Sequence, residues 1–431
     1  MMNTNLYFTS SLVLDNHPMK FAKRKRKLQY YIVLEYFIKQ LEITEYTDFR
    51  LKQYKNILIG NIKKPNLTKS KLDDLISSLL NGNLKPFGKK YRYWIMCDIA
   101  LILIEETDIQ KAADLLKAYL TQRRKVHIDR LLLALKDEKI TIDFADNLIK
   151  QYRKNYEFFK KKELRFIVTA NMSAGKSTLI NSLIGKPIAR TSQEVCTGNV
   201  CYIYNKPFED DCISLENSKL NMNATMSDIT NFEWKTTTNI SSYFRFLKED
   251  KKRVGIIDTP GVNSALNRNH GKITYEALRN EKYDKLIYVL NANKLGTDEE
   301  ISHLKWIFEK VPMEKIIFVI NKIDNFKCID DDIQASVEGV RNDLLKIGYK
   351  DPTICPLSAY FSLLIKLKYS GESLTEDEED EYELYTKKFS KPVYDLSKYY
   401  DGIQINEDDN EYIVMSKKIG LYGLEKILLE E

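Results

Sequence analysis

The chain has 431 residues, of which 43% are hydrophobic and 30% are charged, a composition typical of a globular protein of two or three domains and not of a disordered chain. It contains no apolar run of about 18 residues or more, so the sequence predicts no transmembrane helix, and its start lacks the basic and apolar regions of a secretory signal. The six cysteines and four histidines are dispersed without a zinc-binding pattern, so we expect free thiols, as in a reducing cytoplasm.

Charge is distributed unevenly along the chain. Residues 1–160 contain 30 Lys and Arg against 18 Asp and Glu, a net charge of +12, whereas residues 161–431 carry −6. The basic part is therefore able either to dock onto the acidic part or to face an anionic surface. Its most basic run, Lys23–Lys27, has two interpretations as well: a contact to phosphates or anionic lipid, or simply a solvated helix end.

The first 160 residues show helical patterning. Apolar stretches predict about six helices, near residues 28–38, 72–80, 91–105, 108–120, 128–135 and 142–160. The aromatic residues Tyr91, Tyr93 and Trp94 are typical of core packing, and we expect no specific nucleic-acid partner. The sequence thus predicts an all-α N-terminal domain over residues 1–160, without recognisable catalytic chemistry.

From residue 161 onward, apolar strands alternate with helices. Strands are expected near residues 164–169, 199–204, 253–257, 285–290, 315–320 and 353–357. This alternation predicts an α/β domain over residues 161–431, with a mostly parallel twisted sheet and helices on both faces. The acidic segment 375–381 is typical of a capped helix start, so we expect an acidic helical insertion near 366–412 and not a metal site.

A phosphate-binding loop, Ala170–Ser177, lies between an expected strand and an expected helix. The residues predicted to surround the phosphates are Asn171, Met172, Ser173, Ala174, Gly175, Lys176, Ser177 and Thr178. Backbone N–H groups of such a loop bind phosphate oxygens, Lys176 reaches the β- and γ-phosphates, and Ser177 holds Mg²⁺. Ala170 departs from the usual first glycine, and alanine tolerates most backbone geometry except positive φ.

Three further motifs follow in order. In Asp258-Thr259-Pro260-Gly261, the aspartate is expected to bind Mg²⁺ through water, and the Gly261 N–H to sense the γ-phosphate.

In Asn321-Lys322-Ile323-Asp324, the Asp324 carboxylate can accept hydrogen bonds from guanine N1–H and N2–H₂, donors that adenine lacks, so GTP is favoured over ATP. The Ser358-Ala359 pair fits the loop that offers N–H groups to guanine O6. Every motif ends an expected strand, which predicts one shared site.

The phosphate-binding loop followed by Asp258–Gly261 resembles the GTPase domain of dynamin-like proteins, bacterial ones in particular. Residues 262–274, 288–293 and 420–429 resemble other parts of the same domain, so the resemblance covers roughly residues 163–431. It implies hydrolysis of GTP to GDP and phosphate with Mg²⁺, slow in the isolated chain, and a homodimer formed through the GTP-binding face.

The resemblance also implies roles for single residues. Thr197 would be the threonine that holds Mg²⁺ and orients the attacking water. Ser173 matches the position that helps a monovalent cation, K⁺ or Na⁺, to neutralise charge between the β- and γ-phosphates, in place of an arginine finger. Arg190 is a second candidate for that charge.

Dynamins carry long helices after the GTPase domain, and this sequence stops at the closing helix. Residues 1–160 are too short for a full stalk, which leaves room for a second protein that supplies one. We expect a cytoplasmic protein that is peripheral to an anionic membrane if the basic run binds lipid. The alternative function is an interaction module that binds GTP, hydrolyses it slowly or not at all, and regulates a partner protein.

Overall fold

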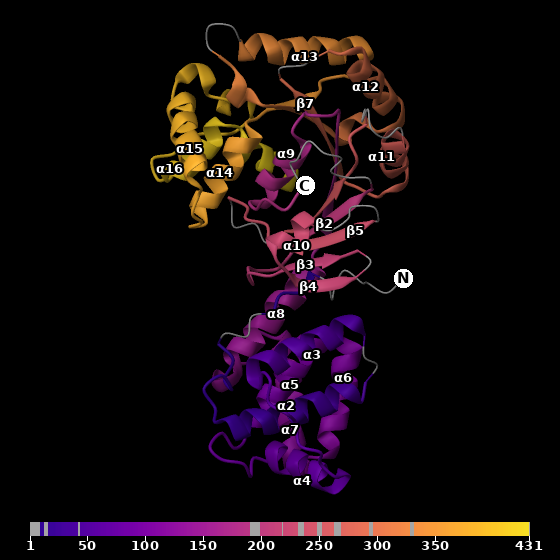
Figure 1. Ribbon diagram of the computed structural model, residues 1–431, viewed down its shortest axis with the longest axis vertical. Helices are drawn as coiled ribbons and strands as arrows, with labels where there is room; N and C mark the ends of the chain where they lie inside the picture. The colour runs from indigo at the N-terminus through magenta and orange to yellow at the C-terminus, as the bar shows by residue number, and fades with distance from the viewer. Residues whose placement is uncertain are drawn as a thin grey trace. The chain divides into compact units, whose positions relative to one another are not determined.

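The computed structural model describes residues 9–12, 16–41, 44–189, 199–217, 219–231, 237–247, 252–262, 269–292, 296–327 and 332–430. The chain divides into two compact units (Figure 1). The first comprises Met1–Lys161 with Pro207–Asp211, and the second comprises Lys162–Lys206 with Cys212–Glu431. None of the described helices is both long and apolar enough to cross a bilayer.

The first unit is all-helical, which confirms the predicted fold class of the N-terminal part. Its elements are α2 (Arg24–Lys39), α3 (Glu45–Leu58), α4 (Lys69–Leu80), α5 (Lys90–Leu103), α6 (Glu106–Ala118), α7 (Gln122–Lys136), the 3-10 helix η1 (Asp143–Ala145) and α8 (Asp146–Lys160). Helix α5 is the centre of this unit, because every side chain from Tyr91 to Leu103 is buried and the other α-helices contact it. Helix α3 was not predicted, since its buried positions include Thr47 and Arg50 among the apolar residues.

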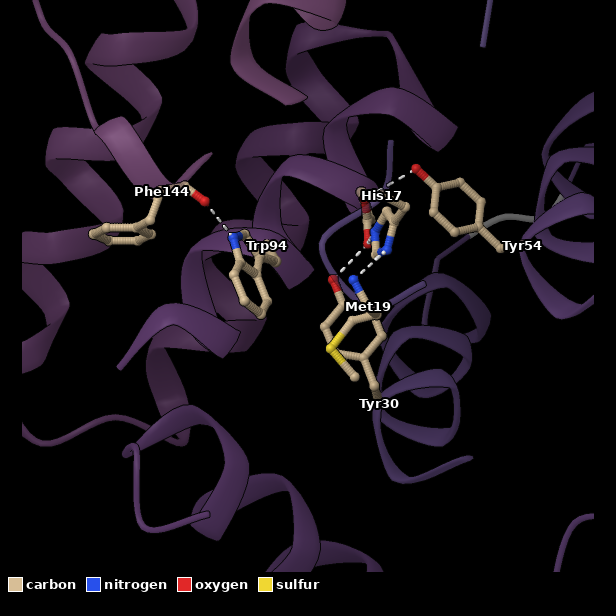
Figure 2. A network of polar contacts seen from close by, with 7 residues as sticks. His17, Met19, Tyr30, Tyr54, Trp94 and Phe144 are labelled. Carbon is tan, nitrogen blue, oxygen red and sulfur yellow. Dashed lines mark hydrogen bonds and ion pairs between the residues drawn. The ribbon is translucent and has the colours of Figure 1, made fainter. Parts of the chain in front are cut away.

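A buried carboxylate on α5 joins several segments of the helical unit (Figure 2). Asp98 accepts hydrogen bonds from the hydroxyls of Tyr30 on α2 and Tyr54 on α3, at 2.5 and 3.0 Å. His17 Nε2 lies 2.9 Å from the same carboxylate, and the Met19 N–H donates to His17 Nδ1, so the ring proton is on Nε2. Burial, reinforced by the Asp98 charge, raises the pKa of both tyrosines, which therefore remain hydrogen-bond donors. Such a satisfied network fixes the register of the helices.

The second unit contains a sheet whose nine described strands lie in the order β4-β3-β5-β2-β6-β1-β7-β8-β9. The strands are β1 (Glu163–Ala170), β2 (Cys201–Asn205), β3 (Ile213–Glu216), β4 (Leu220–Ala224), β5 (Thr238–Ser242), β6 (Arg253–Asp258), β7 (Lys285–Asn291), β8 (Ile316–Asn321) and β9 (Thr353–Pro356). Strands β6, β1, β7, β8 and β9 are mutually parallel, β2 is antiparallel to β6, and β3 is antiparallel to both of its neighbours. The mostly parallel α/β sheet is confirmed. Strands β3 to β5 were missed, because they are short and carry several Asn, Ser and Thr residues.

The helices of this unit are α9 (Lys176–Ile184), α10 (Met226–Asn231), α11 (Asn269–Asn280), α12 (Asp298–Lys310), α13 (Ile333–Ile347), α14 (Ala359–Tyr369), α15 (Glu376–Phe389), α16 (Glu411–Lys418) and α17 (Leu421–Leu429). Short 3-10 helices are η2 (Met313–Lys315), η3 (Ile323–Asn325), η4 (Pro392–Tyr394) and η5 (Ser397–Tyr399). Figure 1 shows α11, α12 and α13 on one side of the parallel strands and α14, α15 and α16 on the other. Helix α15, in the predicted acidic insertion, begins with a capping box between Thr375 and Glu378. All four described cysteines are free thiols: Cys97, Cys201, Cys212 and Cys355.

Candidate nucleotide-binding site

The phosphate-binding loop connects the carboxyl end of β1 to the N-terminus of α9. Gly175 precedes α9 with φ of 89°, and a Cβ built on it would lie 2.3 Å from Asn321 Nδ2, so only glycine fits there. Ser173 also has positive φ, at 63°. Ala170, in contrast, is a buried strand residue and is not among the described residues with positive φ. The backbone at this position therefore has no need of the glycine that the usual motif carries.

Lys176 and Asp258 form an ion pair at the centre of the site. Lys176 is the first residue of α9, and Asp258 is the last residue of β6, whose neighbour in the sheet is β1. Asp258 is only 2% exposed, and this burial raises the pKa of its carboxyl group, whereas the adjacent ammonium group opposes the rise. Ser177 and Thr178 follow on α9 and are partly exposed. The two charges predicted to bind phosphate and metal thus lie in direct contact.

The segment after Asp258 is fastened to the end of β1. The Thr259 hydroxyl donates to the carbonyl of Val168 at 2.8 Å, and the Val262 N–H donates to the carbonyl of Ala170 at 3.3 Å. A Cβ on Gly261 would lie 3.6 Å from the side chain of Met172, so this turn lies against the phosphate-binding loop. The Gly261 N–H is therefore located beside the loop in which the terminal phosphate is expected.

Asn321 connects three loops of the site. Its side-chain amide donates to the carbonyl of Ala174 at 3.0 Å and accepts from the N–H of Ala359, also at 3.0 Å. The next residue, Lys322, has φ of 71°, and its Cε lies 3.7 Å from the position of a Cβ on Gly175. The long Lys322 side chain thus extends along the phosphate-binding loop.

Asp324 and Ser358, the residues predicted to recognise the base, lie in direct contact. The buried Ser358 hydroxyl donates to the Asp324 carboxylate at 2.7 Å. Burial raises the pKa of Asp324, and the hydrogen bond from Ser358 opposes the rise. With Asn321 and Ala359, these residues lie just after the ends of β8 and β9. The N–H groups of Ser358 and Ala359 donate within the protein, to the carbonyl of Ile419 at 3.4 Å and to the Asn321 side chain at 3.0 Å.

Sequence reasoning missed two residues that support these loops. Asn291, at the end of β7, donates to the carbonyl of Ser173 at 3.3 Å. Its position after an apolar strand, within a segment that resembles the family, was an available signal. Lys388, on α15, donates to the carbonyl of Asp324 at 2.6 Å. Nothing in the sequence around Lys388 indicates this contact.

Two predicted residues, Arg190 and Thr197, lie in segment 190–198, outside the described residues. Within the described part of the chain, no group of three or more His, Cys, Asp and Glu side chains has the arrangement of a metal site. The described candidates for Mg²⁺ are the Ser177 hydroxyl and the Asp258 carboxylate. Both present oxygen atoms, the ligand type that this ion takes in proteins, usually alongside substrate phosphates.

Comparison with known proteins shows similarity to the dynamin family over part of the chain. The model of the dynamin family matches residues 167–323, which extend from β1 to η3. A protein of Caldicellulosiruptor sp. (strain Rt8B.4), described as "Uncharacterized protein in xynA 3'region", is 30% identical over 245 residues, which are 54% of this chain and 58% of that protein. Dynamin-like protein 1 of Campylobacter jejuni subsp. jejuni serotype O:23/36 (strain 81-176) is 23% identical over 294 residues, which are 57% of this chain and 40% of that protein. This chain therefore spans at most 58% of the length of these two relatives.

Among solved structures, one of a bacterial dynamin pair aligns with this chain. The structure described as "An oligomerised bacterial dynamin pair provides a mechanism for the long range sensing and tethering of membranes" is 14% identical and has a TM-score of 0.40. The aligned part covers 95% of this chain and 61% of that one.

Proposed function

We propose that residues 167–323, which match the dynamin family model, form a GTPase domain that binds GTP with Mg²⁺ and hydrolyses GTP to GDP and phosphate. The observation that supports this most directly is the position of Asn321. Its amide joins the phosphate-binding loop, through Ala174, to the loop of Ser358 and Ala359. A site already assembled in this way is suited to catalysis by positioning and charge stabilisation.

The phosphate side of the proposed site uses backbone and charge. The N–H groups between Asn171 and Thr178 lie at the N-terminus of α9, where the helix partial charge is positive, and would bind phosphate oxygens. Lys176 would exchange its contact with Asp258 for the β- and γ-phosphates. Ser177 would hold Mg²⁺ directly and Asp258 through water, and the bound ion would neutralise charge that develops on the phosphate oxygens.

Three residues complete the proposed mechanism. Thr197 would hold Mg²⁺ and orient the attacking water, and Ser173 would help a monovalent cation to neutralise charge between the β- and γ-phosphates. The Gly261 N–H would contact the γ-phosphate, so the loss of that phosphate on hydrolysis would be transmitted to the loop after β6.

The base would be selected by Asp324, which would accept from guanine N1–H and N2–H₂. The loop of Ser358 and Ala359 would lie beside guanine O6, and Ala359 would have to release its N–H from Asn321 to donate there.

The test of this function is nucleotide binding and turnover by the wild-type chain and by Lys176→Ala. Calorimetry with a non-hydrolysable GTP analogue is expected to show binding that the matching ATP analogue does not reproduce. Lys176→Ala is expected to lower turnover by about a hundredfold, since it removes a cation that stabilises developing charge. Unchanged affinity and turnover in this variant would refute the assignment.

We propose further that the active unit is a homodimer formed through the GTP-binding face, with a second protein able to supply a stalk. The competing proposal is a slow or non-hydrolysing GTP-dependent module that regulates a partner protein. Both use the same nucleotide-binding site, so the dependence of turnover on protein concentration separates them.

A second proposed function, peripheral binding to an anionic membrane, is favoured by one end of the helical unit. Phe21 is 91% exposed immediately before the basic run Lys23–Lys27, which begins α2. Arg26 donates to the carbonyl of Lys85 at 2.8 Å, so the Lys-containing loop before α5 lies beside this run. An exposed aromatic ring among basic side chains offers both apolar contact and electrostatic attraction, the two contributions to binding at an anionic membrane surface.

A further inference from the structure

The C-terminal half of α15 is in contact with the guanine-recognition loop. The Lys388 ammonium group donates to the carbonyl of Asp324 at 2.6 Å and to the carbonyl of Phe326. Tyr394, in η4 just after α15, donates its hydroxyl to the same Phe326 carbonyl at 3.2 Å. The Lys388 Nζ also lies 4.6 Å from the centroid of the Tyr394 ring, which restrains the ammonium group from a second direction.

The loop held by Lys388 has little regular structure of its own. It begins at Lys322 in the left-handed region, continues through the single 3-10 turn η3, and leaves it at Phe326 in an extended conformation. A non-glycine residue with positive φ persists only where its surroundings impose it. The orientation of Asp324 therefore depends on contacts from other elements.

Asp324 is held at both ends. Ser358 donates to its carboxylate, and Lys388 donates to its backbone carbonyl. A hydrogen bond from an ammonium group to a carbonyl is stronger than one between neutral groups. Lys387, the preceding residue on α15, is exposed to solvent, whereas Lys388 is partly buried. Of these two adjacent lysines, Lys388 is the one that binds the Asp324 carbonyl.

We infer that Lys388 is a positioning residue for guanine selectivity: it fixes Asp324 so that both carboxylate oxygens face the N1–H and N2–H₂ donors of the base. This inference rests on the proposed GTP-binding function. The consequence is that α15, far from the phosphates in the sequence, sets the preference between purine nucleotides. A loosened Asp324 would still accept one hydrogen bond, but it would lose the paired geometry that distinguishes guanine.

The test compares GTP with inosine triphosphate, which has the N1–H donor and lacks the 2-amino group. Lys388→Met is expected to weaken GTP binding about tenfold and inosine triphosphate binding much less, so that the affinity ratio between them shrinks several-fold. Lys388→Arg, which retains a cation and several donors, is expected to restore most of the ratio. Lys387→Met is the matched control and is expected to leave both affinities unchanged.

Folding is monitored by circular dichroism, and Tyr394→Phe provides a milder variant that removes one donor to Phe326 without changing charge. It is expected to shift the ratio in the same direction by a smaller amount. An equal loss for both nucleotides in Lys388→Met, or an unchanged ratio, would overturn the inference. If the wild-type chain binds no guanine nucleotide, the proposed GTP-binding function itself fails. If the wild type binds GTP normally and Lys388→Met leaves the affinity ratio unchanged, only the inference about Lys388 fails.

Discussion

The ammonium group of Lys366 and the carboxylate of Glu425 form an ion pair inside the α/β unit, where their side chains are 0% and 5% exposed. Lys366, on α14, also donates to the carbonyl of Leu183 near the end of α9, and Glu425, on α17, accepts from the N–H of Leu247. Burial lowers the pKa of Lys366 and raises that of Glu425, while the opposite charge of each partner counteracts the shift. This pair connects the C-terminal helix to the helix that begins at the phosphate-binding loop.

Removal of one member of this pair is expected to cost more stability than removal of both. Lys366→Met leaves the Glu425 charge buried without its partner, which should lower the free energy of unfolding by about 3–5 kcal/mol. The double variant Lys366→Met with Glu425→Leu should recover a large part of this loss. Lys368→Met, which breaks the partly exposed pair with Glu379, is the control and should cost about 1 kcal/mol or less. Urea denaturation followed by circular dichroism measures all three, and a double variant no more stable than Lys366→Met would contradict this account.

The pH dependence of stability should contain a contribution from Glu300, in the first turn of α12. Its carboxylate accepts from the N–H of Gly296, and burial raises its pKa from 4.5 to about 7. Between these values the folded protein holds a proton that the unfolded chain releases. The stabilisation that protonated Glu300 gives the folded state is therefore fully present below pH 4.5 and is lost as pH rises toward 7.

Glu300→Gln is accordingly expected to be more stable than the wild type at pH 8, by about 2 kcal/mol, and equally stable near pH 4.5. The nearby His303, whose pKa burial lowers to about 4, contributes equally in both proteins and so cancels from the comparison. Glu299→Gln changes an exposed neighbour on the same helix and serves as control. Denaturation curves at several pH values test this, and a difference that does not vary with pH would argue against a titrating Glu300.

Asp324→Asn should change which nucleotide is bound. The carboxylate is expected to accept two hydrogen bonds from guanine, and the amide replaces one acceptor by a donor, so GTP affinity should fall by tenfold or more, on the order of the loss for an unpaired buried donor. Xanthosine triphosphate, which carries a carbonyl in place of the 2-amino group, should gain affinity. Calorimetric titration with both nucleotides measures the exchange. A parallel loss of both would mean that Asp324 supports the loop without contacting the base.

The motifs of the site could be found in the sequence because each is a short local pattern that ends a buried strand. Parallel strands bring such ends to one edge, so the proximity of Asp258, Asn321 and Ser358 to the phosphate-binding loop follows from topology alone. The parallel part of the sheet could be predicted for the same reason, since its strands are continuous apolar runs. Strands β3 to β5 could not be predicted, because they are not continuous apolar runs and are recognised only by their pairing with neighbouring strands.

Contacts between distant segments were beyond the reach of local patterns. The bond from Lys388 to Asp324 joins residues 64 positions apart, and a lysine in the last turn of a helix is ordinarily solvated. The Asp98 network is similar, because an aspartate in an apolar helix has no sequence signal that names His17, Tyr30 and Tyr54 as its partners. The ion pair of Lys366 with Glu425 arises in the same way.

Turnover per molecule should rise with protein concentration if the GTP-binding faces of two chains complete each other's site. Phosphate release measured over a wide concentration range, together with light scattering in GDP and in a non-hydrolysable GTP analogue, tests this. The expected result is a larger mass with the analogue only, and a specific activity that increases over the same range. A flat activity near background with clear GTP binding would favour the slow interaction module instead.

Binding to anionic vesicles should depend on the start of α2. The wild-type chain is expected to sediment with vesicles that contain phosphatidylserine and not with purely zwitterionic ones, and to dissociate in about 1 M salt, where charges are screened within about 3 Å. Lys23→Glu with Lys25→Glu should abolish most of the binding, and Phe21→Ser should remove a part that persists at intermediate salt. The matched control is Lys139→Glu, which changes an exposed lysine just after the C-terminus of α7. Equal binding by the control and the Lys23 and Lys25 variant, or binding that ignores salt, would show that this end of the helical unit does not face a membrane.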